Sequence, residues 1–269
     1  MKAKVVLISG GSSGIGKSIG QFLKSKGFVV YGTTRSPEKY ADFEHFKLVK
    51  MDVRDLESIR MAVEYIVKAE GRLDVLVNNA GIGITGPIEE TPHEEIVGVF
   101  NTNFHGYLNT AKAVLPVMRE QNAGLIINIT SIAGYMGLPY RGIYSATKGA
   151  VELVTEALRM ETKDFGVHIT NLAPGDFATD IASGRYHAPV LEGSPYKTAY
   201  EQTLRQIDEG VEQGQDPIKV AHKVFSIINT DKPKVHYKVG SFMQRFSLIL
   251  KKILPDKVYE KLLLNHYKL

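Results

Sequence analysis

Four polar residues in the middle of the chain have types that suit the reduction of a carbonyl group. Tyr144 is followed four residues later by Lys148, a spacing that places a phenol and an ammonium on one face of a helix. Ser131 follows the apolar stretch Leu125–Thr130, and Asn103 occupies another strand-adjacent position. The phenol would transfer a proton and the serine would hydrogen-bond to a substrate oxygen. The Tyr–Lys pair alone is not specific, because chance gives about one such pair for 13 Tyr.

Acid–base chemistry at neutral pH requires a tyrosine whose pKa lies well below its ordinary value of about 10. Lowering the pKa to about 7 takes roughly 4 kcal/mol, because one pKa unit corresponds to about 1.4 kcal/mol. A Lys ammonium about 4 Å away supplies energy of that order at an effective dielectric constant of about 20. We therefore expect Lys148 to lower the pKa of Tyr144, so that the phenol is the general acid in reduction and the general base in oxidation.

The glycine-rich turn near the N-terminus has two phosphate-binding interpretations. Residues Gly11–Ser18 match the P-loop pattern GxxxxGK[ST], in which backbone amides and a Lys hold the phosphates of an NTPase substrate. Gly10, Gly14 and Gly16 also form a GxxxGxG spacing, which lets the backbone approach a dinucleotide pyrophosphate at a helix N-terminus. A turn without a ligand is a third interpretation, although so many glycines weaken a fold that has no use for them.

Residues outside the turn favour the dinucleotide. A P-loop enzyme needs an Asp at the end of an apolar strand to hold Mg²⁺, and the best candidate, Asp52, follows a strand interrupted by Lys50. The next predicted strand ends in Asn78 and Asn79, which supply no carboxylate. The small residues of Asn79–Gly81 suit a turn packed against a cofactor. A P-loop NTPase is therefore the remote alternative.

The end of the second predicted strand indicates which dinucleotide is bound. An acidic residue about twenty positions after the glycine turn selects the free ribose hydroxyl of NAD. The segment Tyr31–Ser36 has no Asp or Glu, whereas Arg35 can fork onto a ribose phosphate with hydroxyl donors from Thr34 and Ser36. We expect NADP(H) to be preferred over NAD(H), unless Arg35 is a solvated loop charge or stacks on adenine.

Short Val- and Ile-rich runs alternate with amphipathic segments, which predicts an α/β fold with a parallel sheet and helical crossovers. The predicted strands are Val5–Ser9, Val29–Thr33, Lys47–Met51, Val75–Val77, Leu125–Thr130, Ile169–Ala173 and Val235–Lys238. The predicted helices are Ile15–Lys26, Leu56–Ala69, Gly106–Arg119, Ser145–Phe165, Tyr200–Glu212 and Pro217–Ile228. No Pro/Gly/Ser-rich linker divides the alternation, so we expect a single domain.

These motifs, in this order, resemble the short-chain dehydrogenase/reductase family from Lys4 to about Thr179. The resemblance rests on the glycine turn, on the NNAG motif at Asn78–Gly81, and on the Pro-Gly motif at Pro174. It implies a Rossmann-type doubly wound sheet of about seven parallel strands with helices on both faces. It also implies an NAD(P)-dependent oxidoreductase with the catalytic set Asn103, Ser131, Tyr144 and Lys148.

The resemblance also assigns further roles. Lys148 would contact the nicotinamide ribose, and Asn103 would help to position Lys148 through a water. A homodimer or homotetramer is expected through the helices Gly106–Arg119 and Ser145–Phe165. The residues expected to bind the dinucleotide are Gly10, Ser12, Ser13, Gly14, Ile15, Gly16, Arg35, Asp52, Val53, Asn79, Ala80, Gly81, Tyr144, Lys148, Pro174, Gly175 and Thr179.

The segment after Pro174 and the C-terminal tail are the candidates for substrate specificity. We expect a dinucleotide-binding and catalytic domain over residues 1–240, with a substrate loop at about 174–198, and a basic amphipathic helical extension over 241–269, broken near Pro255. The extension would contact a membrane surface, pack over the substrate mouth, or form a subunit interface. Apolar and aromatic residues expected to line a pocket for a lipophilic carbonyl or alcohol substrate are Tyr135, Met136, Leu138, Tyr140, Phe177, Ile181, Tyr186 and Val190.

Composition excludes several other classes of protein. The 269 residues include no Cys, carry a net charge of +4 and are 43% hydrophobic, which excludes disulfide scaffolds, Cys-based metal sites and a disordered chain. The spacing of the His residues predicts no metal site, and no nucleic-acid pattern is present. The N-terminus has no signal-peptide core, so we expect a cytoplasmic protein, with peripheral membrane contact if the tail binds lipid. A non-catalytic dinucleotide sensor or scaffold is the main alternative function.

Overall fold

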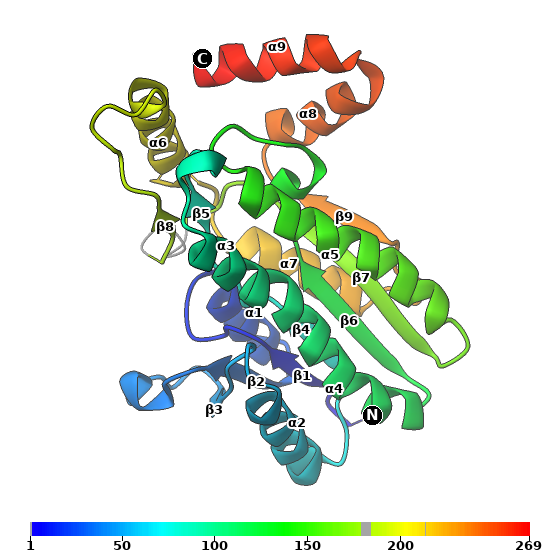
Figure 1. Cartoon of the computed structure of the whole chain (residues 1–269). Helices are drawn as coiled ribbons and strands as arrows, with labels where there is room; N and C mark the ends of the chain where they lie inside the picture. Colours follow the sequence, from blue (N-terminus) through cyan, green and yellow to red (C-terminus); the bar gives the residue numbers. More distant parts are fainter. Residues whose placement is uncertain (1, 179–183, 213) are drawn as a thin grey trace.

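A computed structural model describes residues 2–178, 184–212 and 214–269. Seven strands form one parallel sheet in the order β3-β2-β1-β4-β6-β7-β9 (Figure 1). The strands are β1 (Val5–Ile8), β2 (Val29–Thr34), β3 (Lys47–Lys50), β4 (Val75–Asn78), β6 (Gly124–Ile129), β7 (Val167–Pro174) and β9 (His236–Val239). The chain builds outward from β1 to β3 and then returns to place β4 on the other side of β1. This reversal confirms the predicted doubly wound sheet, and it creates the crevice where such folds bind ligands.

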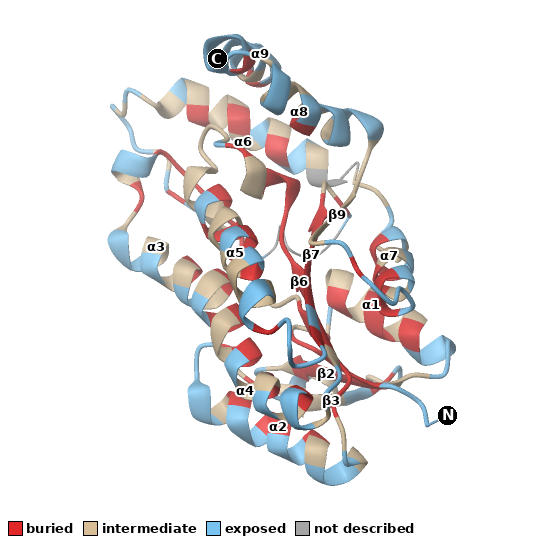
Figure 2. Ribbon diagram, turned by 90° about the vertical axis from the view of Figure 1, so that its right-hand side faces the viewer, coloured by how far each residue is buried: buried red, intermediate tan, exposed pale blue. Residues whose placement is uncertain are grey.

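Helices cover both faces of the sheet (Figure 2). They are α1 (Gly14–Ser25), α2 (Leu56–Glu70), α3 (His93–Phe100), α4 (Gly106–Glu120), α5 (Gly142–Glu161), α6 (Lys197–Glu212), α7 (Ile218–Ile228), α8 (Phe242–Ile253) and α9 (Asp256–Tyr267). Leu23 of α1 and Val224 of α7 pack against one sheet face, and Ile59 of α2 and Val114 of α4 pack against the other. Since both faces are covered, the central strands β1 and β4 are buried along their whole length and show no alternation of apolar and polar residues, as in other parallel sheets.

Local signals in the sequence explain several helix boundaries. The side chain of Asp55 accepts hydrogen bonds from the backbone amides of Glu57 and Ser58 at the start of α2. The same helix ends at Gly71, whose φ of 72° favours glycine. Helix α8 begins with a capping box in which Ser241 and Gln244 satisfy each other's backbone amides. These signals explain both ends of α2 and the start of α8, whereas α3 was not among the predicted helices.

Some short elements were not expected. A π-helical turn at Asn101–His105 joins α3 to α4, so Asn103 lies between two helices and the predicted strand-adjacent position is wrong. Strands β5 (Ile84–Thr85) and β8 (Tyr186–His187) form a small parallel sheet that ties the loop after β4 to the loop after β7. The remaining short turns are η1 (Pro37–Tyr40), η2 (Ile88–Glu90) and η4 (Ile132–Tyr135). Such elements are too short for a periodic apolar pattern to reveal them.

The C-terminal extension consists of two helices, α8 and α9, which meet at Leu254 and Pro255 as the sequence predicts. They lie beyond the carboxyl end of β7 (Figure 1). Leu248 and Tyr259 pack into a small apolar cluster with Met136 and Ala173. Part of the extension therefore covers the side of the fold where substrate is expected to enter. Within the described parts of the chain, no helix combines the length and the apolar character needed to cross a membrane.

Candidate active site

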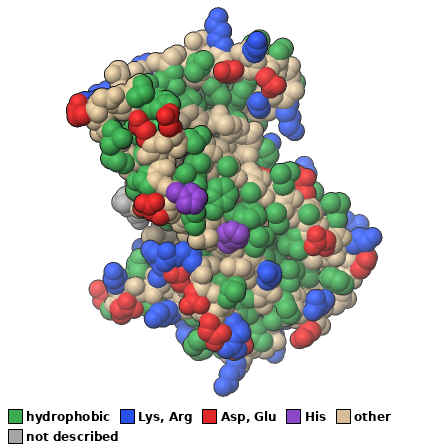
Figure 3. Space-filling model, in the orientation of Figure 1, with side chains coloured by type: hydrophobic (Ala, Val, Ile, Leu, Met, Phe, Trp, Pro, Cys, Tyr) green, Lys and Arg blue, Asp and Glu red, His purple; other side chains and the backbone are tan. Residues whose placement is uncertain are grey.

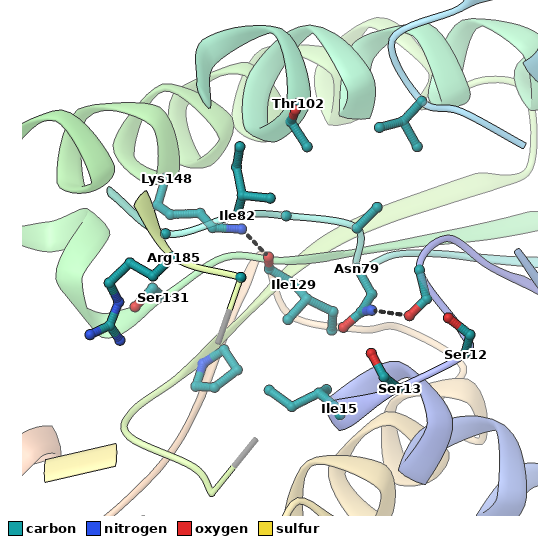
Figure 4. A pocket seen from close by; sticks show the side chains of 18 of the residues that line it. Ser12, Ser13, Ile15, Asn79, Ile82, Thr102, Ile129, Ser131, Lys148 and Arg185 are labelled. Carbon is teal, nitrogen blue, oxygen red and sulfur yellow. Dashed lines mark hydrogen bonds between the residues drawn. The ribbon is translucent and has the colours of Figure 1, made fainter. Parts of the chain in front are cut away.

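A cleft runs along the carboxyl ends of β1, β4 and β6 (Figure 4). Its walls include the glycine turn at one end and Ser131, Tyr144 and Lys148 at the other. Nearly all the residues expected to bind the dinucleotide line this cleft. Gly16 lies instead beneath the turn, and Thr179 lies outside the described residues. The cleft is therefore formed by residues far apart in the sequence, which the parallel sheet brings to one edge.

The glycine turn fits the pyrophosphate of a dinucleotide. Gly14 has a φ of 50°, which strains any residue with a side chain. A Cβ on Gly16 would lie 2.3 Å from the carbonyl oxygen of Gly10, so only glycine allows this close packing. Ser13 precedes α1 in an extended conformation and makes no side-chain cap hydrogen bond, which leaves the first-turn amides available to an anion.

The same turn does not fit a P-loop. The ammonium of Lys17 lies over the ring of Phe43, 5.8 Å from its centroid, and not in the cleft. Asn79 fills the region above the turn, and its side-chain amide donates hydrogen bonds to the carbonyl oxygens of Ser9 and Gly10, each 3.0 Å long. The hydroxyl of Ser9 in turn accepts hydrogen bonds from the amides of Asn79 and Ala80. The NNAG segment thus supports the turn, and the P-loop match is a coincidence of overlapping glycines.

Basic side chains occupy the end of the cleft where an adenine ribose would lie. Arg35 is exposed at the end of β2 and lines the cleft with Thr34. Asp52 is paired with Arg54 at 2.7 Å, and this hydrogen-bonded guanidinium lowers the pKa of the Asp52 carboxyl. Val53 is buried beside these residues, as expected for a position next to adenine. Asp52, an acid at this end of the cleft, is thus already paired with a guanidinium.

Lys148 is held inside the protein at the other end of the cleft. Its Nζ donates hydrogen bonds to the carbonyl oxygen of Ile129 at 3.0 Å and to the hydroxyl of Tyr107 at 3.2 Å. Burial lowers the pKa of Lys148 to about 7, although the carboxylate of Glu152 opposes that shift. The amine therefore changes its charge near neutral pH.

The electrostatic surroundings of Tyr144 differ from the expectation. Its ring centroid lies 5.9 Å from Nζ of Lys148, but burial raises the pKa of the phenol above its ordinary value. The charge of Arg141, the hydrogen bond from Ser131 and the charge of Arg185 oppose this rise, in that order. The expected lowering of the phenol pKa by Lys148 is therefore wrong for this structure. The physical reason is that burial of the phenol outweighs the positive charges and the hydrogen bond that favour its phenolate.

Asn103 is buried close to Lys148, and both side chains approach Gly81. The Asn103 side chain accepts a hydrogen bond from the amide of Ile82 and donates one to the Ile82 carbonyl oxygen, both 2.9 Å long. It also donates to the hydroxyl of Thr147 at 3.2 Å. A Cβ on Gly81 would lie 3.2 Å from Oδ1 of Asn103 and 3.4 Å from Nζ of Lys148. The asparagine and the lysine thus both lie close to Gly81, where a larger residue would crowd their polar ends.

Only some of the residues predicted to line the substrate pocket lie at the cleft. Phe177 lines the cleft, and Met136 packs against Tyr259 of the C-terminal extension. Tyr135 points elsewhere: its hydroxyl donates to Glu152 at 2.7 Å and lines a separate cavity, so the prediction for this residue is wrong. Ile181 lies outside the described residues. No group of three or more His, Asp or Glu side chains is arranged to hold a metal ion within the described part of the chain.

Three residues near the reacting groups were missed by sequence reasoning. Tyr107 is buried, and its hydroxyl links Lys148 to the carbonyl oxygen of Ile129. Its position four residues after Asn103 was the available signal. Arg141 and Arg185 line the cleft beside Tyr144. Arg141 precedes Tyr144 by one helical turn, whereas Arg185 lies in an irregular segment that offers no spacing to recognise.

Comparisons with known proteins agree with this geometry. The family model described as short chain dehydrogenase matches residues 4–189. A 3-ketodihydrosphingosine reductase of Bacteroides thetaiotaomicron is 39% identical over 261 residues, covering 97% of this chain and 96% of that protein. An NADPH-dependent 3-dehydrocapnine reductase of Ornithobacterium rhinotracheale is 33% identical, covering 98% of each chain. The crystal structure of a short-chain dehydrogenase from Streptomyces avermitilis superposes with a TM-score of 0.84 at 29% identity, covering 100% of this chain and 97% of that one.

Proposed function

The chain belongs to the short-chain dehydrogenase/reductase family, an NAD(P)-dependent oxidoreductase family, and from this premise we propose that it reduces the carbonyl group of a lipophilic small molecule with NADPH. The observation that carries the proposal is the arrangement of Ser131, Tyr144 and Lys148 at one end of a cleft whose other end is a phosphate-binding glycine turn. In this proposal the chain also oxidises the corresponding alcohol.

The proton is proposed to come from Tyr144. A bound reduced nicotinamide would supply the hydride to the carbonyl carbon. The Ser131 hydroxyl donates a hydrogen bond to the carbonyl oxygen, and the phenol of Tyr144 gives its proton to the same oxygen. Because burial raises the pKa of Tyr144, the phenol stays protonated at neutral pH and is ready to act as an acid. In the oxidation of an alcohol, the phenolate of Tyr144 takes up the proton.

Lys148 is proposed to stabilise the phenolate that develops on Tyr144. Its protonated form places a positive charge near the phenol, and its hydrogen bonds to Ile129 and Tyr107 hold it in place. Asn103 fixes the segment around Ile82 and approaches Lys148 across Gly81. Its role in the proposal is positioning, with Lys148 also contacting the nicotinamide ribose.

NADP(H) is the proposed cofactor. Arg35 and Thr34 line the end of the cleft expected to hold the adenine ribose, and the nearby carboxylate of Asp52 is already paired with Arg54. A ribose phosphate would gain a charge-assisted contact from Arg35. The relative from Ornithobacterium rhinotracheale is named as NADPH-dependent, which agrees with this proposal.

The substrate is proposed to be lipophilic. Met136, Leu248 and Tyr259 form part of an apolar cluster where the extension covers this side of the fold. Two relatives that span nearly the whole chain are named as reductases of 3-ketodihydrosphingosine and 3-dehydrocapnine. The apolar cluster beneath the C-terminal extension supports this proposal. The names of the two relatives also support it, because each describes the reduction of a carbonyl group on a named compound.

We also propose that the protein contacts a membrane surface and associates with copies of itself. The extension contacts an anionic membrane surface, because Phe242, Met243 and Ile253 are exposed on helices that also carry Lys residues. Blue and green side chains, with some red ones among them, lie over the end of the molecule that holds α8 and α9 (Figure 3). The chain also forms a homodimer or homotetramer through α4 and α5, where Leu153 and Met160 are exposed apolar side chains.

Loss of NADPH absorbance with a panel of long-chain, aromatic and steroidal ketones tests the proposed activity. We expect turnover with at least one long-chain ketone and a lower rate when NADH replaces NADPH. A protein that binds NADPH tightly but oxidises it with no member of the panel would instead fit a dinucleotide sensor.

A further inference from the structure

Two arginine side chains converge on the reacting end of the cleft. The guanidinium of Arg141 lies 5.6 Å from the ring centroid of Tyr144. Arg185 reaches the same region from the segment after β7, and its side chain is only 6% exposed. The Arg185 side chain extends beside Ser131 (Figure 4). Two positive charges therefore face the place where a substrate carbonyl would bind.

The carboxylates around these guanidiniums are poorly placed to neutralise them. The contact between Arg185 and Asp208 is 3.4 Å long, and the Asp208 side chain is 53% exposed. Asp176 also lies at the cleft, but its carboxylate accepts a 2.7 Å hydrogen bond from the side chain of Gln244 in α8. Within the described residues, Arg141 has no salt bridge. Arg141 instead shares a hydrogen bond with the uncharged phenol of Tyr267. The Arg185 side chain is buried with only a long contact to an exposed carboxylate, so an anion from outside the protein would offset the cost of burying that charge.

The apolar surface formed by the C-terminal extension ends near these two arginines. Tyr267 of α9 is buried, and it lies close enough for the charge of Arg141 to oppose the burial that raises the pKa of its phenol. Met136 and Tyr259 lie in the neighbouring apolar cluster. A ligand with a charged head and an apolar chain would match both surfaces.

We propose that Arg141 and Arg185 form a binding site for an anionic group of the substrate, a carboxylate, sulfonate or phosphate carried close to the reacting carbonyl. This inference rests on the proposed function and names its substrate class. Each guanidinium presents a planar pair of N–H donors, which matches two oxygens of such a group.

The phosphates of the dinucleotide do not account for this pair. The glycine turn and Arg35 lie at the opposite end of the cleft, where a pyrophosphate and an adenine ribose would be held. Arg185 instead packs on Gly83, where an added Cβ would lie 2.9 Å from its Cγ. Gly83 lies two residues after the NNAG motif and lines the cleft. If the two arginines bound the dinucleotide instead, replacing them would weaken NADPH binding.

The test is a calorimetric titration of the NADPH-saturated protein with octane-1-sulfonate and, separately, with 1-octanol. We expect the wild type to bind the sulfonate at least tenfold more tightly than the alcohol. Arg141→Met and Arg185→Met should each weaken sulfonate binding about tenfold or more and leave alcohol binding unchanged. Arg185→Lys should recover only part of the affinity, because it restores the charge but not the planar pair of donors. Arg205→Met, which removes an exposed arginine of α6, is the matched control and should behave like the wild type.

Three results would overturn the inference. They are equal affinity of the wild type for sulfonate and alcohol, unchanged sulfonate binding in both Met variants, and a parallel loss of NADPH affinity, which would assign the arginines to the cofactor. Unchanged NADPH affinity in the variants also shows that they fold. Because the titration needs no turnover, it stands apart from the catalytic role of Tyr144. A Tyr144→Phe variant that kept full activity would refute the proposed chemistry and leave the sulfonate result unaffected.

Discussion

Lys148 and Tyr144 together set the proton chemistry of the cleft. Lys148 has a pKa of about 7 because it is buried, and Tyr144 has a raised pKa for the same reason. At neutral pH the tyrosine is therefore protonated, and the lysine is the group whose charge varies. This assignment differs from the one that residue types and spacing suggest, because i,i+4 spacing reveals proximity but not burial.

The pH dependence of ketone reduction follows from this assignment. The ammonium form of Lys148 stabilises the developing phenolate, and it is present below pH 7 and lost above it. We expect kcat for reduction to fall above about pH 7 with the loss of one proton, while Tyr144 remains protonated. Initial rates from pH 5.5 to 9.5 at saturating NADPH measure this. A rate that stays constant up to pH 9 would contradict it.

Arg35 is expected to determine the choice of dinucleotide. Replacing it with Ala removes a charge-assisted hydrogen bond worth about 1.5–3 kcal/mol, so NADPH affinity should fall roughly 10- to 150-fold while NADH affinity is unchanged. Fluorescence titration of both nucleotides measures the change. Arg60→Ala is a matched control, since Arg60 is an exposed arginine of α2 that pairs with Glu57 and Glu64. Equal affinity of the wild type for the two nucleotides would refute the assignment.

At the scale of elements, strong periodic patterns were predictable and short irregular segments were not. The strands that carry Ser131 and the NNAG motif were found because buried parallel strands are continuous apolar runs. Asn103 was misplaced because a π-helical turn has no signature in a single sequence. Arg185 was missed because only tertiary pairing of β5 with β8 holds its segment against the cleft.

Helices α8 and α9 present an exposed apolar surface whose partner can be tested. Phe242 and Ile253 are 69% and 68% exposed, and lysines flank them. We expect the protein to float with vesicles that contain anionic lipid, and to float several-fold less when Phe242→Ser and Ile253→Ser are combined. Vesicles of neutral lipid are the control for charge. Equal flotation of the double variant, or none of the wild type, would show that these side chains do not bind membranes.

At the scale of the whole molecule, the doubly wound topology does most of the positioning. Residues from Gly10 to Arg185 meet in one cleft because the parallel strands end on one edge of the sheet, and the reversal between β3 and β4 opens a crevice there. The sequence motifs identified this edge of the sheet and the residues at both ends of the cleft. The charge balance within the cleft depended on packing between distant segments, and only the structure revealed it.

The association of whole molecules is also testable. Leu153 and Met160 on α5 are 69% and 68% exposed, and their spacing of seven residues places them on one face of the helix. We expect a dimer or tetramer by light scattering, and dissociation on Leu153→Glu. Met61→Glu replaces a comparably exposed residue of α2 and should leave the mass unchanged. A monomeric wild type would contradict the proposed assembly.

The central claim is that Tyr144 supplies the proton in carbonyl reduction. The most direct measurement is kcat/KM of Tyr144→Phe with the best ketone of the panel, together with the dissociation constant of NADPH for the same variant. General acid catalysis contributes about 10²- to 10⁴-fold, so we expect a loss of that size with NADPH binding unchanged. A Tyr144→Phe enzyme that binds NADPH normally and reduces the ketone at near wild-type rate would contradict the account.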